Sequence, residues 1–225
     1  MNYIYLKTKN RPKSKKPTKK YFVLFFLFIG ILFLSLALVP IIKFQIEYSI
    51  NLKEILNPLS VKYYNRDYTQ LSNWFVQNPN NQNLLLPDVQ VTYSLTIPKL
   101  NVKDAVVTFG SMDLKKSLIQ YPNTALPGQS GNTVIFGHSV LPQFFNPKSY
   151  LTIFSTLYKL KTGDDIFINY NDSEYKYRVT EMFEVQPDNF SVLDQRFDNK
   201  TITLITCSPP GTYLRRLVVK AQLAL

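Results

Sequence analysis

Reactive side chains are scarce in this chain of 225 residues, which contains one cysteine, one histidine and one tryptophan. A single cysteine excludes an intrachain disulfide framework and any cysteine-rich zinc or iron–sulfur site. Charged residues make up only 18% of the chain and hydrophobic residues 45%, which excludes a disordered acidic chain and a coiled coil. The sequence also has no nucleotide, flavin or structural-metal motif, so we expect no cofactor and no metal.

The excess of positive charge is confined to one end of the chain. The formal net charge is +11, but residues 1–20 hold eight Lys or Arg and no acid, which leaves +3 on the other 205 residues. The basic residues therefore form a tail, and the rest of the chain is close to neutral. Because an apolar run follows directly, we interpret residues 1–20 as a basic cytoplasmic tail that faces anionic lipid, and we expect no nucleic-acid partner.

An uninterrupted apolar run, YFVLFFLFIGILFLSLALVPII, follows the tail at residues 21–42. As a helix these 22 residues would extend about 33 Å, which matches a hydrocarbon layer of about 30 Å. The alternative is a cleaved signal peptide with Ser35-Leu36-Ala37 as its cleavage site, but such apolar regions usually have only about 7–15 residues. We predict a single-pass signal anchor in the cell membrane, with the tail in the cytoplasm and all later residues exported.

Residues 43–92 show no single hydrophobic period and are predicted to form an extracytoplasmic stalk with some helix. A cluster of Asn and Pro at residues 78–81 breaks regular structure. Trp74 and Phe75 fit two interpretations, either packing residues of the stalk or part of a flap that covers a groove.

From residue 93 to residue 225 the sequence is typical of a mostly β domain. Short runs rich in Val, Ile, Thr, Tyr and Phe recur between turn residues, as in NTVIFGH, DIFINY and TITLITC. Such runs indicate an antiparallel sandwich or a closed barrel, and about 130 residues suit one small barrel. Only residues 112–120, MDLKKSLIQ, have helical spacing.

The single histidine and the single cysteine both follow apolar strands. His138 ends the run TVIFG and Cys207 ends the run TITLIT, while Arg216 opens a third apolar run. A thiolate nucleophile, an imidazole that moves protons and a permanently charged guanidinium suit acyl transfer through a thioester. Each group also has a structural interpretation, as a buried small side chain, a turn residue or a surface charge. Spacing does not decide between Arg215 and Arg216, which a strand sends to opposite faces.

The local motifs resemble those of the sortase family. TLITC at residues 203–207 and the following SPPGTYLRRLVV are similar to the sortase pattern of Thr-Leu-x-Thr-Cys, a Pro/Gly loop and Arg-Leu-Val-Val. Upstream, LTIPKLNVKDAVV and YPNTALPGQSGNTVIFGHS resemble the first strands and the histidine-bearing strand of that family. The resemblance covers about residues 93–225, and the short loop after the cysteine is closest to class D, class E and pilus-type class C members.

The resemblance implies a closed eight-stranded antiparallel β-barrel with short helices. It implies that Cys207 is the nucleophile, His138 the acid/base and Arg216 the substrate-stabilising arginine, with Thr206 binding substrate and Arg215 a bystander. Sortases cleave a C-terminal LPxTG-like sorting signal and pass the acyl group to an amine of a peptidoglycan precursor or a pilin lysine. Ser139 departs from the arginine that many relatives carry after the histidine.

Two other functions stay open on the sequence. The chain could be a Cys/His peptidase that only hydrolyses, although such folds commonly place the cysteine before the histidine. It could also be a membrane-tethered β-domain without enzymatic activity.

Overall fold

The computed structural model describes residues 18–51, 67–74 and 90–224. The chain divides into two compact units, residues 1–45 and residues 46–225. Phe75 and the breaker at residues 78–81 lie outside the described residues.

The first unit holds most of a long helix, α1 (Thr18–Asn51). Within the described residues, Tyr21–Lys43 is the one stretch of helix that is long and apolar enough to cross a membrane. The large apolar side chains of this stretch are exposed and do not pack against the other described parts of the protein. The helix continues past Pro40 and beyond the predicted anchor, and the boundaries 1–20, 21–42, 43–92 and 93–225 stay predictions.

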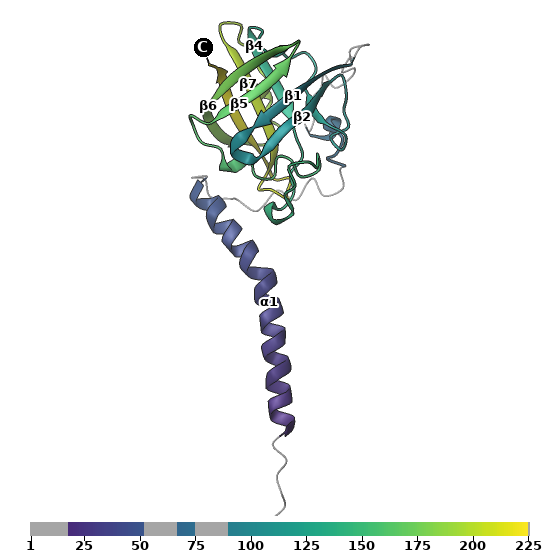
Figure 1. Cartoon of the computed structure of the whole chain (residues 1–225), viewed down its shortest axis with the longest axis vertical. Helices are drawn as coiled ribbons and strands as arrows, with labels where there is room; N and C mark the ends of the chain where they lie inside the picture. The colour runs from purple at the N-terminus through teal and green to yellow at the C-terminus, as the bar shows by residue number, and fades with distance from the viewer. Residues whose placement is uncertain (1–17, 52–66, 75–89, 225) are drawn as a thin grey trace, which may run out of the picture. The chain divides into compact units, whose positions relative to one another are not determined.

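The second unit contains a closed barrel of eight strands (Figure 1). The order around the barrel is β1-β2-β3-β4-β7-β8-β6-β5, and β5 pairs again with β1. The strands are β1 (Val91–Ile97), β2 (Val102–Phe109), β3 (Leu118–Gln120), β4 (Gly131–Phe136), β5 (Asp165–Tyr170), β6 (Ser173–Val185), β7 (Lys200–Ser208) and β8 (Arg215–Leu223). The 3₁₀ turns are η1 (Leu71–Asn73), η2 (Pro98–Leu100), η3 (Pro142–Phe144), η4 (Leu157–Lys159) and η5 (Phe190–Leu193). This confirms the mostly β fold and the eight-stranded closure.

The barrel is mixed, so the expectation of antiparallel pairing throughout was wrong at two seams. β2 pairs parallel with β3, and β4 pairs parallel with β7. Parallel neighbours need a long crossover. The chain between β4 and β7 supplies one, because β5 and β6 lie within it.

The helical spacing of residues 112–120 was also misleading. The structure has turns here, followed by β3, whose three residues are all buried. Leu118 and Ile119 are both inaccessible to solvent, and β3 pairs with β2 on one side and β4 on the other. Burial on both faces removes the alternation that identifies a strand in sequence, and tertiary pairing overrides local spacing.

Alternation along β7 and β8 defines an outward face of the barrel. Lys220 and Gln222 of β8 reach solvent, so every second residue on these strands points outward with them. The register pairs Thr203 with Lys220 and Cys207 with Arg216, which places Cys207 on the same face. The members of this outward face are Asn132, Val134 and Phe136 of β4, Thr201, Thr203, Ile205 and Cys207 of β7, and Arg216, Val218, Lys220 and Gln222 of β8.

Candidate active site

Three strand ends bring the predicted catalytic residues to one end of the outward face. Cys207 is the penultimate residue of β7 and faces Arg216, the second residue of β8. β4 runs parallel to β7 with Phe136 opposite Ile205, so His138, two residues further, emerges beside Cys207. The structure therefore brings together all three groups.

Hydrogen bonds fix the end of β4 against the end of β7. The Gly137 amide donates to the Ile205 carbonyl (3.1 Å), and the Thr206 hydroxyl donates to the Gly137 carbonyl (2.8 Å). One residue beyond His138, the Ser139 hydroxyl donates to the carbonyl of Cys207 (3.0 Å). The histidine is thus held between two residues that are each bonded to the nucleophile's strand.

Gly137 is glycine because the space beside it is filled. A Cβ atom there would lie 2.7 Å from Cδ2 of Leu118 and closer still to Cδ2 of Phe154. Both side chains are fully buried, so neither can withdraw into solvent. This close approach lets the end of β4 pack tightly just before His138.

The His138 ring is oriented and largely buried. Its Nδ1 lies 3.1 Å from the Ser139 carbonyl, which can only accept, so Nδ1 carries the hydrogen and Nε2 holds the lone pair. Burial lowers the pKa of His138 below its usual value, while the bond to Ser139 and the negative charge of Asp67 oppose that change. The neutral imidazole is favoured, and its Nε2 can take up a proton.

The Cys207 side chain is inaccessible to solvent. Burial raises the pKa of the thiol above its usual value, and the charge of Arg216 partly opposes this. At neutral pH the sulfur is therefore protonated in this conformation. A thiol in this state is a poor nucleophile.

Arg216 is only 1% exposed and is enclosed by carbonyls and aromatic rings. Its Nη2 donates to the Trp74 carbonyl (2.8 Å) and its Nη1 to the Arg215 carbonyl (3.1 Å). The guanidinium carbon lies 5.0 Å from the centre of the Trp74 ring and 5.6 Å from that of Tyr68. Its Nε–H is buried and has no hydrogen-bond partner among the described residues.

Arg215 points to the other face of β8. Its Nη1 lies 3.7 Å from Oε2 of Glu184, and Glu184 also accepts a short hydrogen bond from the Ser208 hydroxyl. The structure thus decides between the two arginines that the sequence could not distinguish. Arg216 lies opposite Cys207, and Arg215 does not. Arg215 takes part in a largely buried ion pair.

Residues 67–74, which the sequence placed in the stalk, pack on the barrel and cover these groups. The Leu71 amide donates to the Met112 carbonyl, and the Leu114 amide donates to the Thr69 carbonyl (both 2.9 Å). The Trp74 ring meets Phe136 edge-on at 5.4 Å. We call residues 67–74 the cover segment.

Tyr68 anchors the other end of the cover segment, because its ring stacks on that of Tyr213 at 4.0 Å. Leu71 and Trp74 belong to the same buried cluster as Cys207. The sequence offered one signal for the cover, aromatic residues in a polar linker, and the flap interpretation of Trp74 agrees with this packing.

Thr206 lies on the barrel strand but on the opposite face from Cys207. It is fully buried, and its hydroxyl donates a hydrogen bond to the Gly137 carbonyl. Its expected part in substrate binding stays a prediction, and its contact in this structure is with the strand that carries His138.

Comparison with known proteins agrees with this geometry. Residues 95–224 match the family described as Sortase domain. Sortase A of Bacillus anthracis is 31% identical over 144 residues, which cover 63% of this chain and 63% of that protein. The chain thus spans less than two thirds of the length of this relative.

Solved structures share the barrel. A Sortase D5 transpeptidase of Clostridium perfringens superposes with a TM-score of 0.52 at 32% identity, over 60% of this chain and 79% of that chain. Sortase C of Clostridium perfringens, solved with the C-terminal cell wall sorting motif, gives a TM-score of 0.51 at 27% identity, over 66% and 77%. Since the family match covers more than half of the sequence, the chain belongs to the sortase family.

Proposed function

We propose that this protein is a membrane-anchored cysteine transpeptidase that cleaves an LPxTG-like C-terminal sorting signal and transfers the acyl part to an amine. One observation carries the proposal, the meeting of the only thiol, the only imidazole and one buried guanidinium at adjoining strand ends. The sorting motif bound to the C. perfringens sortase C supports the substrate class.

The chemistry proceeds in two balanced steps. His138 takes the thiol proton of Cys207, and the thiolate attacks the scissile carbonyl carbon; the C–N bond then breaks as His138 protonates the leaving amine. The acyl group is now a thioester on the sulfur. An incoming amine attacks the thioester, His138 accepts its proton, the C–S bond breaks and the thiolate regains a proton.

Arg216 supplies donors for the developing negative charge. Its bond to the Trp74 carbonyl shows that the guanidinium can hold a peptide carbonyl, and its Nε–H is a further donor without a protein partner. Preorganised donors of this kind act on the oxyanion without reorganising in the transition state. Thr206 is expected to contribute to substrate binding through the same strand end.

Catalysis requires the cover segment to move. Cys207 and Arg216 have no access to a peptide while Trp74 and Tyr68 lie over them. Displacing the cover would hydrate the thiol and lower its pKa, because burial is what raises it. Thiolate formation is thereby coupled to substrate entry.

The N-terminal helix supports a place at the cell membrane. Tyr21–Lys43 has the length and composition of a membrane span, and the basic tail precedes it. The positive-inside rule then puts the tail in the cytoplasm and the barrel outside. The amine acceptor would be a peptidoglycan precursor or a pilin lysine.

The test is a transfer reaction with the full-length chain in detergent. An LPxTG peptide and a primary amine should give a ligated product that grows with amine concentration and disappears in Cys207→Ala. Cleavage at a rate and yield independent of the amine would identify a hydrolase instead. No cleavage of any LPxTG-like peptide by a folded chain with an accessible thiol would support a non-enzymatic β-domain.

A further inference from the structure

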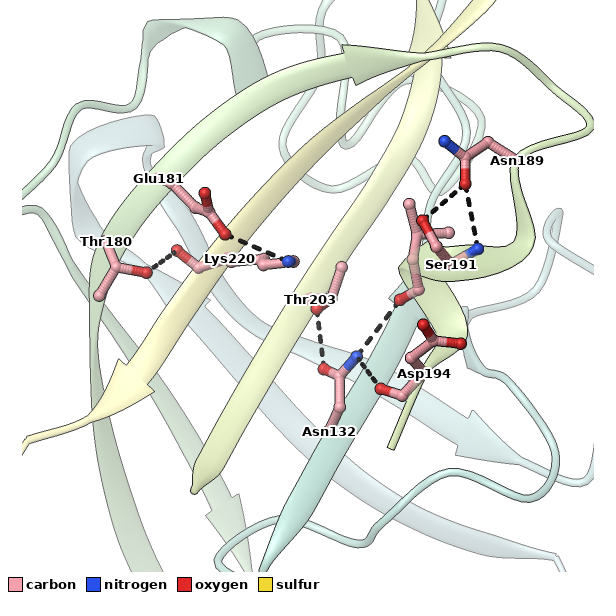
Figure 2. Close-up of polar contacts among 9 residues, drawn as sticks. Asn132, Thr180, Glu181, Asn189, Ser191, Asp194, Thr203 and Lys220 are labelled. Carbon is pink, nitrogen blue, oxygen red and sulfur yellow. Dashed lines mark hydrogen bonds and ion pairs between the residues drawn. The ribbon is translucent and has the colours of Figure 1, made fainter. Parts of the chain in front are cut away.

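A pocket lined by polar side chains lies on the outward face, at the opposite end from Cys207. Its volume is about 590 Å³, and strands β4, β6, β7 and β8 contribute to its walls together with the segment that joins β6 to β7. Figure 2 shows the polar side chains that meet there. The lining residues used below are Asn132, Glu181, Ser191, Asp194, Thr203 and Lys220.

This polar pocket continues the face that carries the catalytic groups. Thr203 and Cys207 are four residues apart on the same side of β7, a separation of about 13 Å at roughly 3.3 Å per residue. Between them lie the apolar side chains of Ile205 and, on β8, Val218, which are inaccessible to solvent in this structure and belong to the same buried cluster as Leu71 and Trp74 of the cover segment. Once the cover segment has moved, as the proposed function requires, one extended peptide could lie over the catalytic end, the apolar middle and the polar pocket.

The wall of the pocket is held in place by a buried amide. Asn132 is 6% exposed, and its Oδ1 accepts a hydrogen bond from the Thr203 hydroxyl (2.8 Å). Its Nδ2 donates to the carbonyls of Val192 (3.3 Å) and Asp194 (3.4 Å), as Figure 2 shows for the strand and the adjoining segment. The amide thus attaches the β6–β7 connection to the sheet and fixes the pocket's shape.

The charges around the pocket are balanced. Lys220 Nζ lies 3.1 Å from Oε1 of Glu181, and both side chains keep part of their surface in water. Arg196 and Asp194 add one charge of each sign to the lining. A site without a net charge does not favour an anion or a cation, whereas hydroxyl, amide and ion-pair groups offer donors and acceptors to neutral polar side chains.

The proposed reaction sets the direction in which a peptide would lie. The acyl part must stay bound while the leaving amine departs and the new amine enters beyond the strand ends. The four residues that precede the scissile bond in an LPxTG-like motif span about 13 Å when extended, which is the distance from Cys207 to Thr203. The residues just before the motif then reach the polar pocket.

We infer that this pocket is a specificity site that selects neutral polar residues, such as Asn, Gln, Ser or Thr, immediately before the cleaved motif. The inference rests on the proposed function. It adds a substrate requirement that the motif itself does not contain. Because one or two neutral hydrogen bonds contribute about 0.5–1.5 kcal/mol each, the expected preference is about tenfold.

The test compares full-length protein on three peptides: the motif alone, the motif after three Asn or Ser residues, and the motif after three Leu residues. We expect kcat/KM to be about tenfold higher for the polar extension, with the change in KM and not in kcat. Lys220→Ala should remove most of this preference and leave turnover of the bare motif unchanged. Lys99→Ala is the matched control, because Lys99 is likewise partly exposed and pairs with one carboxylate, Asp164, at 3.6 Å.

A cross-linking experiment then locates the bound peptide on the protein. A diazirine on the residue before the motif should cross-link to Ser191–Arg196 or Lys220, located by mass spectrometry of the Cys207→Ala chain. Normal transfer with equal kcat/KM for all three peptides would overturn the inference and leave the proposed function standing. Cross-links confined to other surfaces would also overturn it, whether or not transfer occurs. Failure of transfer on every peptide would instead count against the proposed function.

Discussion

At the scale of single residues, neighbouring arginines on β8 have different surroundings. Arg216 shares a face with Cys207 and holds a peptide carbonyl, while Arg215 pairs with Glu184 on the other face. Since a strand reverses the side-chain direction at each residue, only one of them can serve the thiol.

Arg216→Ala should lower kcat by about 100-fold or more, which is typical for the loss of one oxyanion donor. Arg216→Lys should recover little, because an ammonium group keeps the charge but loses the planar fork of donors. Arg215→Ala should lower the melting temperature and leave kcat of the folded protein nearly unchanged. Steady-state kinetics and thermal denaturation distinguish the Arg216→Ala variant from the Arg215→Ala variant. An equal loss of kcat in these two variants would refute the assignment of Arg216 as the residue that stabilises the substrate.

Gly137 is a second residue whose identity has a local cause. Gly137→Ala should cost about 1–3 kcal/mol of stability, because the new methyl group overlaps Phe154 and Leu118. The displaced backbone should also lower kcat through His138. The double variant Gly137→Ala, Phe154→Leu should regain part of the lost stability and part of the lost kcat. Chemical denaturation and steady-state kinetics measure the two quantities. An alanine variant with unchanged stability and rate would show that the packing is looser than described.

Ser139 replaces the arginine that resemblance to many sortases leads one to expect, and its hydroxyl is bonded to the Cys207 carbonyl. Ser139→Ala should reduce kcat several-fold, since a neutral hydrogen bond contributes about 1 kcal/mol. Ser139→Thr, which keeps the hydroxyl, should retain most of the rate. Loss of activity in both variants alike would indicate a steric role in place of the hydrogen bond.

Among the elements of the fold, the cover segment packs in the same buried cluster as the Cys207 thiol and encloses Arg216. Its aromatic rings enclose Arg216 and its apolar residues bury Cys207. Burial is also the largest cause of the changed pKa values of both Cys207 and His138. A displacement of these eight residues would therefore alter the reactivity of the site.

Trp74→Ala should speed alkylation of Cys207 by iodoacetamide at least tenfold. The pH at half-maximal rate should fall, because burial raises the pKa of the thiol and the substitution removes part of that burial. Tyr93→Ala, which removes a buried aromatic ring from β1, is the control for general loosening. An unchanged rate, or a midpoint that rises, would contradict the role of the cover.

The elements of the fold differ in how well the sequence predicts them. The β4 and β7 runs have flanking turns and β-branched residues, so both strands and the positions of His138 and Cys207 at or just beyond their ends were predictable. β3 was not, because its pairing partners are distant in sequence and its residues are buried on both faces. For the cover segment, the sequence offered a flap as one of two interpretations of Trp74, but its contacts with Met112 and Arg216 depend on tertiary packing and were not predictable.

In the chain as a whole, an apolar helix with the length and composition of a membrane span precedes the barrel, and we propose that the barrel is exported. The eight basic residues of the tail set the proposed orientation. In intact cells, a membrane-impermeant maleimide should label Cys207 of the Trp74→Ala chain from outside. Replacing the eight Lys and Arg of residues 1–20 by Gln should reduce that labelling. Labelling that requires cell lysis would contradict the topology.

In the proposed reaction, the sulfur of Cys207 carries the acyl group. The direct measurement is the intact mass of the full-length protein, quenched in acid after mixing with an LPxTG peptide without an amine. We expect an added mass equal to the peptide up to its threonine, located on Cys207, lost on treatment with hydroxylamine and absent from His138→Ala. A peptide that is cleaved while the protein mass stays unchanged under single-turnover conditions, or an adduct on any other residue, would contradict it.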